Sequence, residues 1–124
     1  MLKDALAVAL GGALGSVLRW LVSSAFARGG EARFPWGTLA VNLAGSFVIG
    51  LVLGWANERG PLAPTWRLLV VTGVLGGFTT FSALSWETLA LARSGQPLSA
   101  VGYSVGSLAG GLLAATAGLA LVRR

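Results

Sequence analysis

Four long apolar stretches alternate with short polar segments along the chain. They run from about Asp4 to Ala27, Phe34 to Ala56, Arg67 to Leu91 and Leu98 to Val122. Each holds about 20 to 25 residues, which as a helix rising about 1.5 Å per residue crosses a hydrocarbon core of roughly 30 Å. Pro35 and Pro97 stand where helices begin, a position that tolerates proline. The pattern predicts an all-α integral membrane protein with four transmembrane helices and a single domain over residues 1–124.

The third stretch contains an unusual run, GVLGGFTTFSALSWE, at positions 73–87. Gly76 and Gly77 are followed closely by the β-branched Thr79 and Thr80, and this combination forms helix poorly. A break at this depth frees backbone carbonyl and N–H groups that only protein or water can cover, and such breaks often form ion sites. We therefore expect a break in the third helix.

Composition excludes several classes of function. The chain has 124 residues, of which 55% are hydrophobic and 10% charged, and it has no cysteine and no histidine. Disulfides, thiol chemistry, imidazole metal sites and Ser–His catalysis are therefore excluded, and no carboxylate pair points to an enzyme. The net charge of +5 comes from basic residues dispersed between the apolar stretches, unlike the clustered patch of a nucleic-acid-binding protein.

Positive charges are nearly balanced across the predicted membrane. The side of both termini carries Lys3, Arg59, Arg67, Arg123 and Arg124, and the other carries Arg28, Arg33 and Arg93, with Arg19 if its side chain extends there. Since positive residues set membrane orientation, this weak bias allows insertion both ways and hence an antiparallel dimer. Glycines at four-residue spacing, such as Gly11 and Gly15, predict close helix packing, both within a subunit and at a dimer interface.

Polar side chains recur inside the predicted spans. Thr38, Asn42 and Ser46 follow i, i+4, i+8 spacing and share one helix face. Tyr103 and Ser107 form a second stripe at i, i+4 in the fourth stretch. Any one of these side chains can simply bond between helices and hold the bundle together. Two stripes on different helices nevertheless favour a lined path through the membrane.

Four further residues each leave two interpretations open. Arg19 either extends to the interface or places a fixed positive charge near an anion vestibule. Glu87 is either a proton or cation site or a hydrogen-bonded structural acid, and its partner must come from another helix or from water. Phe78 and Phe81, on either side of the expected break, either pack ordinarily or turn their positive ring edges toward an anion.

The chain resembles the Fluc family of bacterial fluoride channels, also called CrcB proteins, over essentially its whole length. The resemblance rests on three segments, GGALGSVLRW, FPWGTLAVNLAGSFVIG and GVLGGFTTFSALSWE. It implies a fluoride-selective channel that exports F⁻ across the bacterial cytoplasmic membrane and relieves fluoride toxicity. It also implies an antiparallel homodimer of dual-topology subunits in the lipid bilayer, with two pores and one structural Na⁺ at the dimer interface.

The family's functional positions correspond to residues of this chain. The resemblance implies that backbone carbonyls of Gly76 and Thr79 hold the Na⁺, that Asn42 is the pore asparagine and that Phe81 is the first pore phenylalanine. The candidate fluoride path also includes Thr38, Tyr103, Ser107, Thr80, Ser82, Glu87, Arg19 and Phe78.

Two departures from the family pattern concern this path. Leu84 stands where the family has a second pore phenylalanine, and Gly111 replaces a third hydroxyl of the polar track. Leu84 either slows a working homodimer or marks a chain that pairs with a homologous subunit.

The main alternative is a small four-helix multidrug/proton antiporter, which is also a dual-topology dimer. Such exporters carry an essential carboxylate in the first helix, where this chain has only Asp4 at the start. A purely structural accessory subunit would explain the glycines but not the polar run of the third stretch.

Overall fold

The computed structural model describes residues 1–27 and 34–123, and all its regular elements in these ranges are helices. They are α1 (Leu2–Ala27), α2 (Trp36–Arg59), α3 (Pro64–Arg67), the π-helix η1 (Leu68–Leu75), α4 (Gly76–Phe78), α5 (Phe81–Arg93) and α6 (Pro97–Val122). Four spans, the third formed by Pro64–Arg93, are long and apolar enough to cross a membrane. The predicted all-α membrane class with four helices is thus confirmed. Arg28, Arg33 and Arg124 lie outside the described residues.

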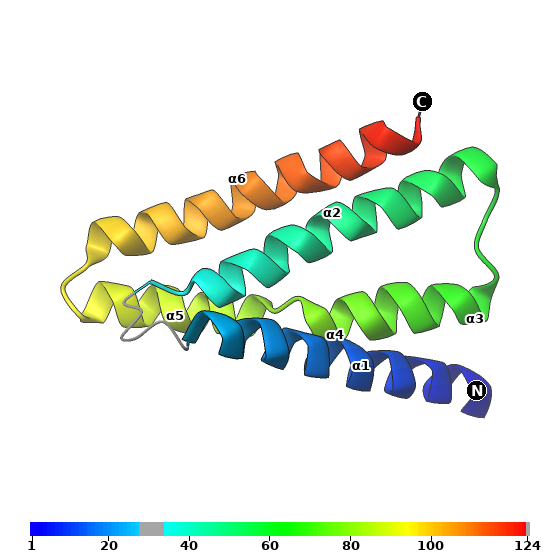
Figure 1. Cartoon of the computed structure of the whole chain (residues 1–124), viewed down its shortest axis with the longest axis horizontal. Coiled ribbons are helices and arrows are strands. Elements are labelled where there is room, and N and C mark those ends of the chain that lie inside the picture. The colour runs from blue at the N-terminus through cyan, green and yellow to red at the C-terminus, as the bar shows by residue number, and fades with distance from the viewer. Residues whose placement is uncertain (28–33, 124) are drawn as a thin grey trace.

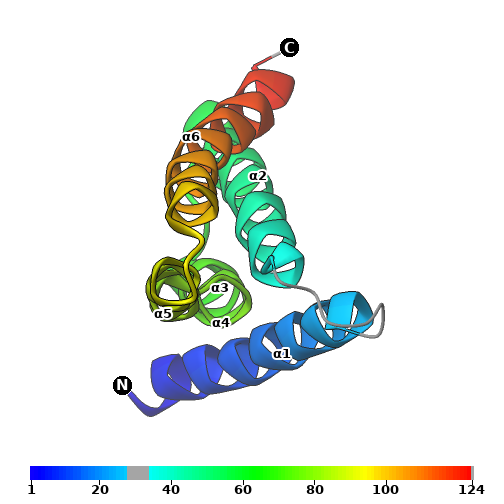
Figure 2. The same ribbon diagram turned by 90° about the vertical axis from the view of Figure 1, so that its left-hand side faces the viewer.

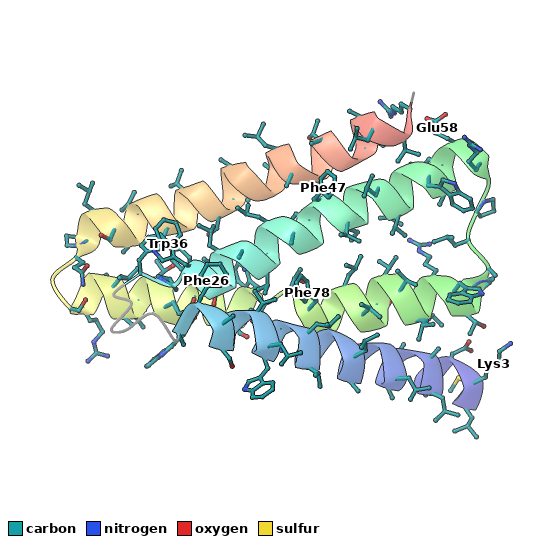
Figure 3. All side chains as sticks on the ribbon, viewed as in Figure 1. Lys3, Phe26, Trp36, Phe47, Glu58 and Phe78 are labelled. Carbon is teal, nitrogen blue, oxygen red and sulfur yellow. The ribbon has the colours of Figure 1, made fainter. Side chains whose placement is uncertain are left out.

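The third span lies between the packed pair α2 and α6 on one side and α1 on the other. α6 packs on α2 above it, and α1 lies below it against η1 and α4 (Figures 1 and 2). The N-terminus and the end of α6 lie at the same end of the molecule, as four crossings require (Figure 1). Glu58 and Arg123 form an ion pair of 3.7 Å at that end, where Lys3 also lies (Figure 3).

Glycines bring α1 close to the third span. A Cβ added to Gly77 would lie 2.6 Å from the carbonyl oxygen of Gly12, and one added to Gly73 would lie 2.8 Å from the Cα of Gly11. No side chain larger than hydrogen fits at such a crossing without moving a helix. This glycine ridge therefore packs within one subunit.

A second glycine contact joins α2 and α6. A Cβ added to Gly118 would lie 2.9 Å from the amide nitrogen of Leu51. Gly102 and Gly106, on the same helix as Gly118, have nothing within 4 Å of an added Cβ. The regularly spaced glycines thus divide into some that pack inside the subunit, as predicted, and some that face outward, for which packing at a dimer interface stays a prediction.

The third span is interrupted at Thr79 and Thr80. Both have extended backbones, with φ −84° and ψ 158° at Thr79 and φ −152° and ψ 117° at Thr80. Gly76 and Gly77 stay helical, so the interruption falls at the threonines and not at the glycines. Thr80 caps α5, since its side-chain Oγ1 accepts from the amide of Ala83 at 3.2 Å.

Candidate ion pathway

An open groove of about 740 Å³ lies between α2, α6 and the third span, and it includes the helix interruption. Its polar lining residues are Asn42, Ser46, Thr79, Thr80, Ser85, Thr88, Ser104 and Ser107. Polar groups on membrane-spanning segments must find partners in protein, water or an ion. The groove is therefore the candidate ion pathway.

Asn42 of α2 holds the interrupted backbone. Its Oδ1 accepts from the amide of Thr80 at 2.8 Å, and its Nδ2 donates to the carbonyl of Thr80 at 3.0 Å. The Oδ1 thus replaces the helical acceptor that the amide of Thr80 loses at the break. The Nδ2 adds a second donor to the carbonyl of Thr80, which as the N-cap of α5 still accepts the first hydrogen bond of that helix. The Nδ2 group has a second N–H, so Asn42 can still donate one hydrogen bond toward the groove.

Glu87 of α5 joins three helices in what we call the acid cluster, Thr38, Glu87 and Tyr103. The hydroxyl of Thr38 on α2 donates to Oε1 at 2.8 Å, and that of Tyr103 on α6 donates to Oε2 at 2.6 Å. The partners of Glu87 therefore come from other helices, as its own helix face predicts. Tyr103 is only 1% exposed, and the ring of Phe34 packs edge-on against it at 5.3 Å.

A smaller cavity of about 330 Å³ borders the acid cluster. It is lined by Thr38 and Glu87 together with Ser23, Phe26, Ala27, Phe34, Pro35, Trp36, Gly37 and Ala90. Phe26 and Trp36 lie in the half of the molecule away from Lys3 and Glu58 (Figure 3). Neither Thr38 nor Glu87 lines the larger groove. Most candidate path residues therefore gather in two places, the groove at the helix interruption and the acid cluster.

Ser107 presents a buried hydroxyl to the groove. It is 7% exposed, and its Oγ has no hydrogen-bond partner among the described residues. A buried hydroxyl without a partner costs about 1 to 3 kcal/mol. A bound ion or water in the groove would remove that cost.

The two phenylalanines at the break face different surroundings. Phe81 lines the groove and is 81% exposed. Phe78 lies beside the break (Figure 3), and its ring would be 3.4 Å from a Cβ added to Gly45 of α2. Phe78 does not line the groove. Leu84, one turn after Phe81, lines the groove and packs against the buried cluster of Leu91, Ala100 and Tyr103.

Ser82 and Arg19 lie outside the groove lining. The hydroxyl of Ser82 is 3.3 Å from that of Thr80, so it contacts the break from the first turn of α5. Arg19 lies half-buried on α1 and lines neither the groove nor the cavity beside the acid cluster. The structure thus does not bring Arg19 together with the other candidate residues.

Two backbone carbonyls at the break lose their usual helical donors. In an unbroken α-helix, the carbonyl of Gly76 accepts from the amide of Thr80 and that of Thr79 from the amide of Ala83. Here the amide of Thr80 donates to Asn42, and the amide of Ala83 donates to the side chain of Thr80. Gly76 and Thr79 both line the groove. The described residues contain no cluster of three or more acidic side chains that could hold a metal.

Comparisons with known proteins point to the same family as the three sequence segments. The family described as "CrcB-like protein, Camphor Resistance (CrcB)" matches residues 6–119. The chain is 48% identical over 118 residues to the "Fluoride-specific ion channel FluC" of Rhizobium meliloti (strain 1021), covering 95% of this chain and 94% of that one. It is 53% identical over 116 residues to a protein of the same name from Thermus thermophilus, covering 94% and 91%. The predicted resemblance is confirmed.

Proposed function

This chain belongs to the CrcB family, and we propose that it is the subunit of a fluoride-selective channel that lets F⁻ leave the bacterial cell. Two of its relatives are named fluoride-specific ion channels. Its four apolar helices make it a multi-pass membrane protein of the bacterial cell membrane. Such a channel is not an enzyme, because it only has to replace the water around an ion and let the ion pass.

The groove carries this proposal, because it offers hydrogen-bond donors to an anion inside the membrane. Asn42 keeps one N–H free, and the hydroxyl of Ser107 is buried without a partner among the described residues. Fluoride is small and strongly hydrated, so it needs several donors to replace its water. Hydrogen bonds to a charged group are stronger than neutral ones, which favours its entry into such a path.

The aromatic ring of Phe81, which also lines the groove, supports the same proposal. Its ring is largely exposed there, and the edge of an aromatic ring carries partial positive charge. A ring edge can therefore contact an anion without binding it tightly. Weak contact of this kind suits conduction, which requires the ion to leave as readily as it enters.

We further propose that one Na⁺ is bound at the break. The carbonyls of Gly76 and Thr79 fit this ion, because their helical donors are engaged elsewhere and carbonyl oxygens suit hard cations. Bound there, the ion would supply a fixed positive charge near the anion path. Two carbonyls from one chain make half of a four-oxygen site, so a second copy must supply the other half.

We propose that the second copy is an antiparallel homodimer partner. The groove is open along one side, and Phe81 is too exposed for an aromatic ring at the centre of a finished pore. A partner in the opposite orientation would close the groove and give two equivalent pores. The nearly balanced loop charges allow both orientations.

The antiporter alternative lacks a suitable carboxylate in the described part of the chain. Asp4 is half-buried and bonds to the N-terminal ammonium at 3.2 Å. Glu87 lies in the third span, and both of its oxygens already accept hydrogen bonds. Neither matches an essential first-helix acid.

Ion efflux from liposomes containing the purified chain tests the channel proposal. We expect rapid fluoride efflux and no chloride efflux above that of empty liposomes, because a narrow path lined by a few donors admits only the smaller ion. Protein-free liposomes and liposomes with an unrelated four-helix membrane protein serve as controls. Comparable chloride efflux would contradict selectivity, and absent fluoride efflux would contradict the channel.

A further inference from the structure

Most hydroxyls in the groove are already bonded within their own helix. Ser85, Thr88 and Ser104 each donate to the carbonyl one turn back, at 3.0, 2.7 and 2.9 Å. Such a bond uses the single O–H donor of the hydroxyl and leaves no donor for an anion. Ser46 and Ser107 line the same groove, but neither makes a side-chain hydrogen bond with another described residue.

Ser46 reaches across from α2 to α6. A Cβ added to Gly111 would lie 3.3 Å from the Oγ of Ser46, so this hydroxyl occupies the space beside the bare backbone of Gly111. Gly111 follows Ser107 by one helical turn on the same face of α6. Ser46 likewise follows Asn42 by one turn on α2. The hydroxyl of Ser46 therefore lies on the groove side where these two helices face each other.

We infer that Ser46 is a further fluoride-binding residue, whose hydroxyl donates to the ion beside Ser107 in the space that Gly111 leaves open. The inference rests on the proposed fluoride function of the groove. A hydroxyl can rotate its O–H toward an anion, and two hydroxyls from facing helices can bind the ion together. Glycine at position 111 is part of the arrangement, because a larger residue would crowd the oxygen of Ser46.

Fluoride efflux from liposomes containing Ser46→Ala tests this inference. We expect a decrease of roughly tenfold or more, the effect of losing one hydrogen bond to a charged group. Thr116→Ala is the matched control, since it removes from α6 a hydroxyl that lies outside the groove lining and already bonds to the carbonyl of Leu112 at 2.8 Å. That variant should keep its flux within about twofold of wild type, because a hydroxyl bonded within its own helix contributes little elsewhere.

A double variant moves the hydroxyl from one helix to the other. Ser46→Ala with Gly111→Ser frees the space beside position 111 and places a new hydroxyl there. We expect it to recover most of the flux lost in Ser46→Ala. Recovery would identify the hydroxyl in this space as the functional group, because the two variants share the same alanine at position 46.

Several outcomes would overturn the inference. Ser46→Ala with wild-type flux would exclude a role in conduction, and a double variant that assembles but stays slow would exclude transfer of the hydroxyl. Loss of oligomer in Ser46→Ala, seen by size-exclusion chromatography, would make Ser46 a packing residue. A silent wild-type protein would instead overturn the proposed function, and the role of Ser46 with it.

Discussion

At the scale of single residues, the amide of Asn42 has two tasks. It accepts from the amide of Thr80 in place of the helical acceptor lost at the break, and it donates to the carbonyl of Thr80. It also keeps one N–H that can face an anion. The i, i+4, i+8 stripe on α2 predicts that Asn42 lies inside the protein, but a stripe cannot distinguish these tasks. They become visible only with the break, 38 positions further along the chain.

Asn42→Asp should abolish fluoride efflux and lower stability. The carboxylate can still accept from the amide of Thr80, but it places a second acceptor opposite the carbonyl of Thr80, where the amide donated at 3.0 Å. That carbonyl keeps its bond within α5 but loses a second donor and meets a charged oxygen, which lowers stability, and the negative charge repels fluoride. Liposome efflux and thermal unfolding in detergent measure the two effects.

Thr116→Ala is the control for this variant, because its hydroxyl bonds only within α6, outside the groove lining, and it should change neither measurement. If Asn42→Asp conducts at the wild-type rate, then Asn42 does not present a donor to the ion. If its stability is unchanged, then the bonds to Thr80 do not hold the break.

At the scale of helices, the third span shows why the interruption lies where it does. The weak helix propensity of the run predicts an interruption but not its position. Gly77 stays helical because α1 packs directly against it, and Thr80 breaks because Asn42 and its own side chain satisfy the backbone there. Tertiary contacts thus override the local preference for breaking at glycine. The π-helix η1 before the break carries no comparable signal in the sequence.

Gly11→Ala should loosen the packing of α1 on the third span. Its added methyl group would lie 2.9 Å from the Cα of Gly73, and neither backbone can yield without moving a helix. Overpacking of this kind costs about 1 to 3 kcal/mol. Gly12→Ala is a closely matched control, because the neighbouring position has nothing within 4 Å of an added Cβ. Thermal unfolding of both purified variants in detergent measures the difference, and equal stabilities would contradict this packing.

At the scale of the whole molecule, hydropathy predicts where the membrane spans lie, but it does not predict which side chains of different spans form hydrogen bonds. The four stretches end within a few residues of the observed helices, because span length is set by membrane thickness. The hydrogen bond from Thr38 to Glu87 joins residues 49 positions apart, and no local pattern specifies it. The site therefore follows from the sequence as a set of polar positions, and its pairings follow only from the fold.

The two departures from the family pattern, Gly111 and Leu84, also differ in a way that only the fold reveals. The sequence alone makes Gly111 look like a lost hydroxyl, but the oxygen of Ser46 lies beside it. Among the described residues that line the groove, Phe81 is the only aromatic one, so no second ring there replaces the phenylalanine that position 84 lacks. A substitution that another helix can offset is recognised only when the helices are placed together.

Gly76 provides a test of the proposed dimer and its cation. Within one subunit, a Cβ on Gly76 would meet only the carbonyl oxygen of Val71 at 3.8 Å, an ordinary contact. The subunit's own packing thus does not require glycine there. A second copy that brings its break against this one would require it, because only a bare backbone lets the carbonyls of Gly76 and Thr79 converge on one ion.

Gly76→Leu should therefore fold as a single subunit but fail to dimerise. Light scattering in detergent would measure the loss of dimer, with Gly12→Leu, another position with open space around it, remaining dimeric. Replacing Na⁺ with N-methylglucamine should lower the thermal stability of wild type and leave Gly76→Leu unchanged, because only the dimer binds the ion and is stabilised by it. A Gly76→Leu protein that dimerises and conducts fluoride like wild type would place the interface elsewhere, and the carbonyls at the break would then have no role in holding a cation.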